Sequence, residues 1–212
     1  MKNLIIFDMD GTLVDSGDAI TNTINHVRSH INMKPLEKNY LLENLNNPNI
    51  NSAEFFYNTP AFTKKQTELF EKYYYQACVV DLKVYDGIID LLEKLKQNNF
   101  KLSVATNAHT PFAIKMLTHL QIDSFFSTII GADMVERSKP HPDMIIKTMT
   151  QLNNDPCQTI LIGDSHKDSI AAKNANIDSI LVNWGFSNHD TKGIDCTTNL
   201  LKEIYARYNI HQ

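Results

Sequence analysis

Five short apolar runs, spread along the chain, constrain the fold more than any other feature of the sequence. Each is three or four residues long, does not alternate with polar residues in the manner of a half-exposed strand, and is followed within two residues by Gly, Asp or Asn. Such runs are typical of strands buried on both faces of a parallel sheet. We therefore expect strands at Leu4–Phe7, Leu102–Ala105, Thr128–Ile130, Thr159–Ile162 and Ser179–Val182.

Between the later runs, apolar residues recur with the spacing of an amphipathic helix. The stripes are Ile88, Leu91, Leu92 and Leu95; Ala113, Met116, Leu117 and Leu120; Ile145, Met149 and Leu152; and Leu201, Ile204, Tyr205 and Tyr208. Strands and helices in alternation predict the α/β class, with a doubly wound, Rossmann-like parallel sheet.

The alternation is interrupted from about Asp15 to Leu82, where we find only helical periodicity and expect no strand. The helical stripes here are Ile20, Ile24, Val27 and Ile31, and Leu69, Phe70, Tyr73, Tyr74 and Ala77. Roughly 65 residues are too many for a βα loop, which usually has about 2–6. We therefore expect a core of residues 1–14 and 82–212 with an all-helical insertion at 15–81, in which the Asn-rich stretch from Asn44 to Asn51 is a loop.

Composition excludes several classes of protein. The formal net charge of −4 gives no general attraction to nucleic acid or to an anionic membrane, and no apolar run approaches the length of a membrane span. Cys78, Cys157 and Cys196 lie far apart without a CxxC pair, which argues against a disulfide framework and a zinc site. We expect a cytoplasmic protein, monomeric or weakly dimeric, that binds neither nucleic acid nor membrane.

Asp8 and Asp10 follow the first predicted strand. Side chains two residues apart on an extended segment point the same way, so both carboxylates should project at the carboxyl edge of the sheet, where open α/β sheets bind ligands. Two carboxylates this close repel each other unless a cation lies between them or one is protonated. Gly11 then permits a tight turn. The ordinary alternative is a turn that caps a strand.

Three further strand ends carry polar groups. Thr106 and Asn107 follow the second strand and suit a phosphate oxygen, or else an ordinary helix N-cap. Lys139 precedes a turn stiffened by Pro140, where an ammonium could contact a phosphoryl group, although a solvated surface lysine is the simpler reading. Asp164 follows the fourth strand and suits Mg²⁺, while Ser165 and Asp168 have the spacing of a capping box.

In this order, the four groups resemble the motifs of the haloacid dehalogenase-like superfamily of phosphotransferases. Asp8-Met9-Asp10-Gly11-Thr12 matches the first motif, Thr106 the second, Lys139 the third, and Gly163-Asp164-Ser165 with Asp168 the fourth. The resemblance extends over nearly the whole core. The helical insertion is similar to the cap of the phosphoglycolate phosphatase and β-phosphoglucomutase branch.

The resemblance implies a mechanism. Asp8 would be the nucleophile and Asp10 the general acid and base; Thr106 and Lys139 would bind the phosphoryl oxygens together with nearby backbone groups, including those of Gly11 and Asn107. Mg²⁺ would be held by Asp8, by Asp164 and by the main-chain carbonyl of Asp10, with Asp168 supporting them. The substrate would be a small phosphorylated metabolite enclosed by the cap.

Two other functions stay open. β-Phosphoglucomutases carry a histidine near the start of the cap, and this chain has Ile20 close to that place, with His26 about two turns later, which favours a phosphatase. A non-catalytic binding relative would be expected to have lost one of the four groups. The Asn44–Asn51 stretch lacks the glycine often found in the cap's substrate loop, so the substrate is not specified. Candidate basic contacts from the cap are Arg28, Lys34, Lys38, Lys64 and Lys65.

Overall fold

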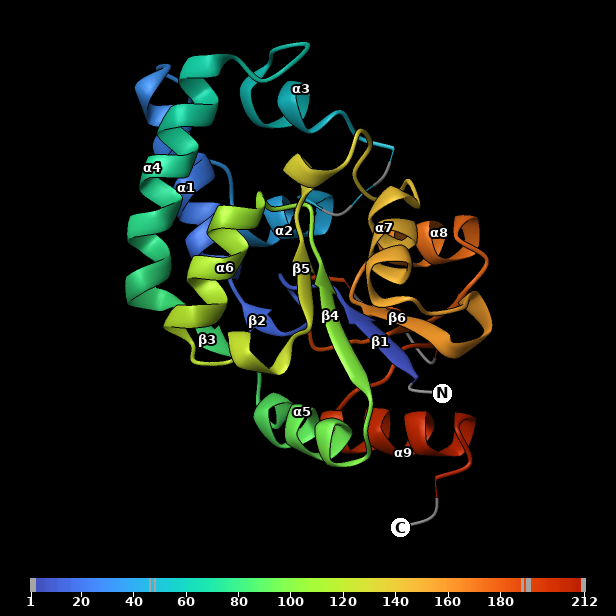
Figure 1. Ribbon diagram of the computed structural model, residues 1–212. Helices are drawn as coiled ribbons and strands as arrows, with labels where there is room; N and C mark the ends of the chain where they lie inside the picture. The colour runs from blue at the N-terminus through green and yellow to red at the C-terminus, as the bar shows by residue number, and fades with distance from the viewer. Residues whose placement is uncertain (1–2, 46, 48, 188, 190–191, 211–212) are drawn as a thin grey trace.

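A computed structural model describes residues 3–45, 47, 49–187, 189 and 192–210. Its centre is a parallel sheet of five strands in the order β5-β4-β1-β6-β7 (Figure 1). The strands are β1 (Leu4–Phe7), β4 (Lys101–Ala105), β5 (Thr128–Ile130), β6 (Thr159–Gly163) and β7 (Asp178–Leu181). Because β1 lies between β4 and β6, the strand order reverses beside it. This confirms the predicted doubly wound α/β fold, and the reversal point is where such sheets bind ligands.

Each face of the sheet has its own layer of helices, which Figure 1 shows as α5 and α9 on one side and α7 and α8 on the other. The helices that flank the sheet are α5 (Ile88–Gln97), α6 (Thr110–His119), α7 (Asp143–Leu152), α8 (His166–Asn174) and α9 (Thr197–Arg207); short 3₁₀ turns lie at Asp123–Phe125, Ala132–Met134 and Pro156–Gln158. Ile5 and Phe7 of β1 pack in the cluster with α5, α6 and α9, whereas Leu4 and Ile6 pack with α7 and α8. Burial on both faces explains why this run is continuously apolar.

The described residues between β1 and α5 include four helices, α1 (Gly17–His30), α2 (Lys38–Leu45), α3 (Ser52–Tyr57) and α4 (Lys64–Asp81). Of the predicted stripes, Ile20, Ile24 and Val27 of α1 and Tyr74 of α4 are buried in the same cluster, and Leu69, Phe70 and Ala77 pack partly buried against it. Of the stretch predicted as a loop, Asn44 belongs to α2 and Asn51 caps α3, while residues 46 and 48 lie outside the described residues. In the part of the chain that the structure describes, no helix is both long and apolar enough to cross a bilayer.

The two chain crossings between the sheet and this helical segment pair with each other. β2 (Val14–Asp15) and β3 (Lys83–Val84) form an antiparallel ribbon in which Val14 lies opposite Val84 and Asp15 opposite Lys83. The expectation of no strand from Asp15 to Leu82 is therefore wrong at Asp15. A strand of two residues is too short to show a periodic pattern, and its partner is distant in the sequence.

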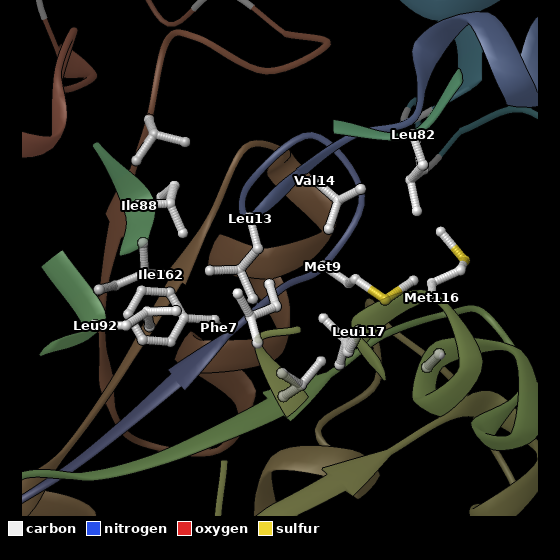
Figure 2. Close-up of a cluster of buried hydrophobic side chains, with 14 of the residues drawn as sticks. Phe7, Met9, Leu13, Val14, Leu82, Ile88, Leu92, Met116, Leu117 and Ile162 are labelled. Carbon is white, nitrogen blue, oxygen red and sulfur yellow. The ribbon is translucent and has the colours of Figure 1, made fainter. Parts of the chain in front are cut away.

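The loop that leaves β1 is anchored by buried apolar side chains. Figure 2 shows Met9, Leu13 and Val14 beside Phe7, near Leu82 and Met116 of later segments. Phe7, Met9, Leu13 and Val14 are fully buried, and each such side chain contributes roughly 1.5–3 kcal/mol. The polar residues that alternate with Phe7 and Met9, namely Asp8 and Asp10, are therefore held in fixed positions.

Candidate active site

Asp8 and Asp10 lie at the carboxyl edge of the sheet. The Asp8 N–H donates to the carbonyl of Ile162 on β6 at 2.8 Å, which continues the strand pairing. Both aspartates line one cavity of about 580 Å³, to which the core and the helices of residues 15–81 contribute. Gly11 turns the chain with φ +81°, and a β-carbon there would overlap the Asp164 carboxylate. The two-residue spacing thus places both carboxylates at one cavity, as predicted.

Lys139 comes from the loop before α7. Its Nζ donates to Asp8 Oδ1 at 2.7 Å and to Asp168 Oδ1 at 2.6 Å, and the side chain is buried. Burial alone would lower the pKa of Lys139, but the charges of Asp168 and Asp8 outweigh it and raise the pKa. The ammonium therefore stays charged. The simpler reading, a solvated surface lysine, is wrong.

Thr106 and Asn107 follow β4, and both line the cavity. Thr106 is buried, and its Oγ1 accepts from the N–H of Ala108 at 3.1 Å. Asn107 pairs with the backbone of Lys139: its Oδ1 accepts from Lys139 N at 3.0 Å and its Nδ2 donates to Lys139 O at 2.9 Å. Its carboxamide therefore positions the lysine loop, and contact with substrate stays a prediction. Neither residue caps α6, whose N-cap is His109.

Asp164 and Asp168 complete an acidic cluster. Asp164 follows β6, and its Oδ2 accepts from the N–H of Phe186 at 2.8 Å. Asp168 Oδ2 accepts from Ser165 N at 3.1 Å and Ser165 Oγ at 2.7 Å, so this pair also has the predicted capping role. One carboxylate oxygen each from Asp8, Asp164 and Asp168 lies within 4.8 Å of the others.

This cluster has more negative than positive charge. Burial raises the pKa of Asp8 to about 7 even though Lys139 opposes the shift. Burial, followed by the charges of Asp8 and Asp168, raises the pKa of Asp164 well above its usual value. Both shifts indicate that a cation would be stabilising here, and an all-oxygen donor set suits Mg²⁺. Lys139 and Ser165 bind the two oxygens of Asp168, so this carboxylate also positions the lysine.

Asp10 is held by two hydroxyl groups. Its Oδ1 accepts from Ser16 Oγ at 2.6 Å and from Tyr74 OH at 3.1 Å, and Tyr74 belongs to α4. Burial raises the pKa of Asp10, although both hydrogen bonds oppose the shift. A carboxyl group that binds a proton this readily can act as an acid. The sequence did not reveal the role of Tyr74, since its hydroxyl on the helical stripe is matched by that of the adjacent Tyr73.

Comparison with known proteins decides the family. The model of the haloacid dehalogenase-like hydrolase family matches residues 5–182, which include all four motifs. The chain belongs to the haloacid dehalogenase-like hydrolase family. The predicted resemblance is therefore confirmed.

Relatives of this haloacid dehalogenase-like hydrolase include proteins named phosphoglycolate phosphatase and pyrophosphatase. A phosphoglycolate phosphatase of Colwellia psychrerythraea is 32% identical over 198 residues, covering 88% of this chain and 86% of the relative. Pyrophosphatase PpaX of Anoxybacillus flavithermus is 29% identical over 182 residues, covering 86% and 84%. The crystal structure of a predicted phosphatase from Clostridium acetobutylicum has a TM-score of 0.81 and 29% identity, covering 97% of this chain and 99% of that one. The predicted phosphatase class is thereby confirmed.

The lining of this hydrolase's cavity differs in two ways from what the sequence predicted. Lys167 of α8 lines the cavity, and its Nζ donates to the carbonyl of Leu45, the last residue of α2, at 3.0 Å. Burial lowers the pKa of Lys167, although the charge of Asp168 opposes the shift. Conversely, the five basic residues expected as cap contacts do not line the cavity. Arg28, for example, is buried and donates to the carbonyls of Lys34 and Phe56.

Proposed function

We propose that this hydrolase is a Mg²⁺-dependent phosphatase that cleaves a small phosphate monoester through an aspartyl phosphate on Asp8. The observation that carries the proposal is the setting of Asp8: buried at the cavity, bonded to the ammonium of Lys139 and two residues from Asp10. The relatives named phosphoglycolate phosphatase and pyrophosphatase support a small phosphorylated substrate.

The first step is phosphoryl transfer to the enzyme. A carboxylate oxygen of Asp8 forms a bond to phosphorus while the bond to the ester oxygen breaks. Protonated Asp10 gives its proton to that leaving oxygen, which departs as an alcohol. Lys139 and the hydroxyl of Thr106 bind the phosphoryl oxygens, where electrostatic stabilisation has its largest effect.

The second step is hydrolysis of the aspartyl phosphate. Asp10, now a carboxylate, takes a proton from water as the water oxygen bonds to phosphorus. The bond between phosphorus and Asp8 breaks, which releases inorganic phosphate and restores both carboxyl groups. Ser16 and Tyr74 hold Asp10 in one orientation for both proton transfers.

Asp8, Asp164 and the main-chain carbonyl of Asp10 would hold Mg²⁺, with Asp168 supporting them through its bond to Lys139. When bound, Mg²⁺ neutralises the excess carboxylate charge and the charge of the phosphoryl group. The excess of buried carboxylates over ammonium groups fits such an ion.

We also propose that residues 15–81 act as a cap on a core of residues 1–14 and 82–212. Hydrogen bonds that cross the junction include those from Ser16 and Tyr74 to Asp10 and from Lys167 to the Leu45 carbonyl. A cap closed in this way excludes bulk water and encloses the substrate.

The mutase alternative is not favoured. A mutase passes the phosphoryl group to a second hydroxyl, yet Ile20 and Ile24 line the cavity where α1 approaches it. His26 instead stacks on Tyr73 with ring centroids 3.6 Å apart, and it is not among the described residues lining the cavity. The non-catalytic alternative leaves unexplained why Lys139 is buried between two carboxylates.

The test combines trapping of the intermediate with an Asp8→Asn variant. After an acid quench in the presence of Mg²⁺ and a phosphate monoester, mass spectrometry should find a phosphoryl adduct on the peptide containing Asp8. Asp8→Asn should lower kcat by about 10⁴-fold or more. Asp15→Asn is the matched control, since Asp15 is exposed and outside the cavity lining. Substantial turnover by folded Asp8→Asn would disprove the covalent route.

A further inference from the structure

The part of the cavity that segment 15–81 lines, here called the helical wall, has the character of an apolar binding site. The apolar residues that segment 15–81 contributes to the lining include Ile20, Ile24, Ile50, Phe56, Phe62 and Phe70. The polar residues that segment 15–81 contributes to the lining are uncharged apart from Glu71. Its Oε1 lies 3.3 Å from Nδ1 of His109. The cavity of about 580 Å³ is in the range of roughly 300–1,000 Å³ that suits drug-sized ligands.

The described residues of segment 15–81 that line the cavity offer no cation of their own to an anionic leaving group. Among the described residues that line the cavity, no lysine or arginine comes from segment 15–81. The stretch 46–51, which includes the two residues outside the described ranges, has no charged residue in its sequence. A carboxylate placed against this wall would lose hydration without gaining a partner, which is costly, and Glu71 would repel it.

The lysines that line the cavity come from the core and already have partners. Lys139 is bonded to Asp8 and Asp168, at the phosphoryl end. Lys167 donates to the Leu45 carbonyl. Lys139 therefore places its charge at the phosphoryl end, whereas the ammonium of Lys167 is bound by the backbone at the end of α2.

One aromatic ring on this wall is half exposed. Phe62 has 50% of its surface exposed, and its ring centroid lies 5.9 Å from that of Tyr57, which also lines the cavity. Folding gains little from a phenyl ring left in water, whereas a ligand ring in the cavity would cover it. Phe62 thus provides a contact surface for a ring in the substrate.

We propose that the preferred substrate is a phosphate monoester of an uncharged, largely apolar alcohol that carries a ring. This inference rests on the proposed function, because it assumes that Asp8 receives the phosphoryl group. The ring would lie among the aromatic side chains of segment 15–81, and the ester phosphate would reach Lys139 and Asp8.

The test compares esters whose leaving groups differ in shape and charge. We would measure Mg²⁺-dependent phosphate release from 2-phenylethyl phosphate, ethyl phosphate, 2-phosphoglycolate and pyrophosphate. The first three are esters of primary alcohols, which keeps the chemical step similar. We expect kcat/KM for 2-phenylethyl phosphate to exceed each of the others by about tenfold or more, since a hydrophobic pocket discriminates by at least that factor per group.

A variant pair tests the same inference at one residue. Phe62→Ala should lower the ratio of kcat/KM for 2-phenylethyl phosphate over ethyl phosphate by about tenfold. Tyr40→Ala, which removes another half-exposed ring of the same segment outside the cavity lining, should leave the ratio unchanged. Because Phe62 is half exposed, its removal should not unfold the protein.

The outcomes separate this inference from the proposed function. If 2-phosphoglycolate or pyrophosphate is used as well as 2-phenylethyl phosphate, and Asp8→Asn is inactive, the phosphatase assignment holds and the apolar substrate is wrong. An unchanged ratio in Phe62→Ala also overturns it. If none of the four compounds releases phosphate in an Asp8-dependent way, the proposed function itself fails.

Discussion

The cavity has two walls that are built differently. On the core side, Asp8 and Lys139 line the cavity, the buried ammonium of Lys139 donates to Asp8 and to Asp168, and Asn107 fixes the backbone that carries the lysine. On the helical side, the lining is mostly apolar, and Phe62 is half exposed. Reaction chemistry needs charges fixed in place, whereas substrate selection needs a surface that fits the leaving group. Under the proposed function, the core side would supply most of the chemistry and the helical side most of the substrate selection.

The largest effect should come from removing the core wall's ammonium. Lys139→Met leaves Asp8 and Asp168 buried without their cation, which typically costs about 3–5 kcal/mol of stability. It also removes a phosphoryl contact, so kcat should fall by about 10²–10³-fold. Urea unfolding and phosphate-release assays would measure both, with the exposed Lys173→Met as control. A variant as stable and active as the wild type would contradict the view that this wall is organised around Lys139.

Magnesium should stabilise the core wall. At 100 times its Kd, the ion should raise the free energy of unfolding by about 2.7 kcal/mol. In chelator, Asp164→Asn should be more stable than the wild type, because it removes a buried carboxylate beside two others; it should also gain little from Mg²⁺. Thermal unfolding with and without Mg²⁺ tests this, and exposed Asp86→Asn should behave as the wild type. Equal stabilisation of Asp164→Asn by Mg²⁺ would mean that the ion binds elsewhere.

The metal-free protein should lose stability as the pH rises through about 7. The folded state raises the pKa of Asp8 from 3.8 to about 7, mainly by burial, so the folded protein binds the proton more tightly than the unfolded chain. The stabilisation is therefore complete below the unfolded pKa of 3.8 and decreases as the pH rises, until Asp8 is ionised in the folded state as well, above about 7. Urea unfolding in chelator between pH 5.5 and about 8.5 would measure the slope. The slope should be smaller in Asp8→Asn, and a slope of opposite sign would contradict the burial argument.

The smallest effect should come from the hydrogen bond between Tyr74 of the helical wall and Asp10. Tyr74→Phe removes one hydrogen bond to Asp10, so kcat should fall by about 2–10-fold with KM little changed, given roughly 0.5–1.5 kcal/mol per bond. Tyr75→Phe is the matched control, because Tyr75 is outside the cavity lining. A loss confined to KM would show that Tyr74 binds the substrate instead of orienting Asp10.

The core wall could be predicted from the sequence because the parallel sheet brings its strand ends together. Asp8, Thr106 and Asp164 each follow a buried apolar run, so locating the runs also located the residues. The helical wall could not be predicted in the same way. Helical periodicity placed Tyr74 on a buried stripe, but its bond to Asp10 depends on how α4 docks on the core.

The basic residues of segment 15–81 in the sequence did not predict which side chains line the helical wall. The basic residues of segment 15–81 were plausible contacts for an anionic substrate, yet Arg28 is used to bind backbone carbonyls and Lys38 pairs with Asp18. Lys167, which does line the cavity, is in the core and was overlooked beside Asp164 and Asp168. Which long side chains reach a cavity is decided by tertiary packing, and their number in the sequence does not reveal it.

The β2–β3 ribbon makes the helical segment exchangeable. Because Val14 pairs with Val84, the chain returns to the core beside the point where it left, so the length of the insert does not change where the two chain crossings lie. Closing a longer or shorter insert changes the entropy only slowly with length. In evolution or in the laboratory, a different insert could be joined at Asp15 and Lys83 while Asp8, Lys139 and Asp164 stay in place. Recombination that exchanges the insert could then change the substrate while the catalytic residues of the core stay the same.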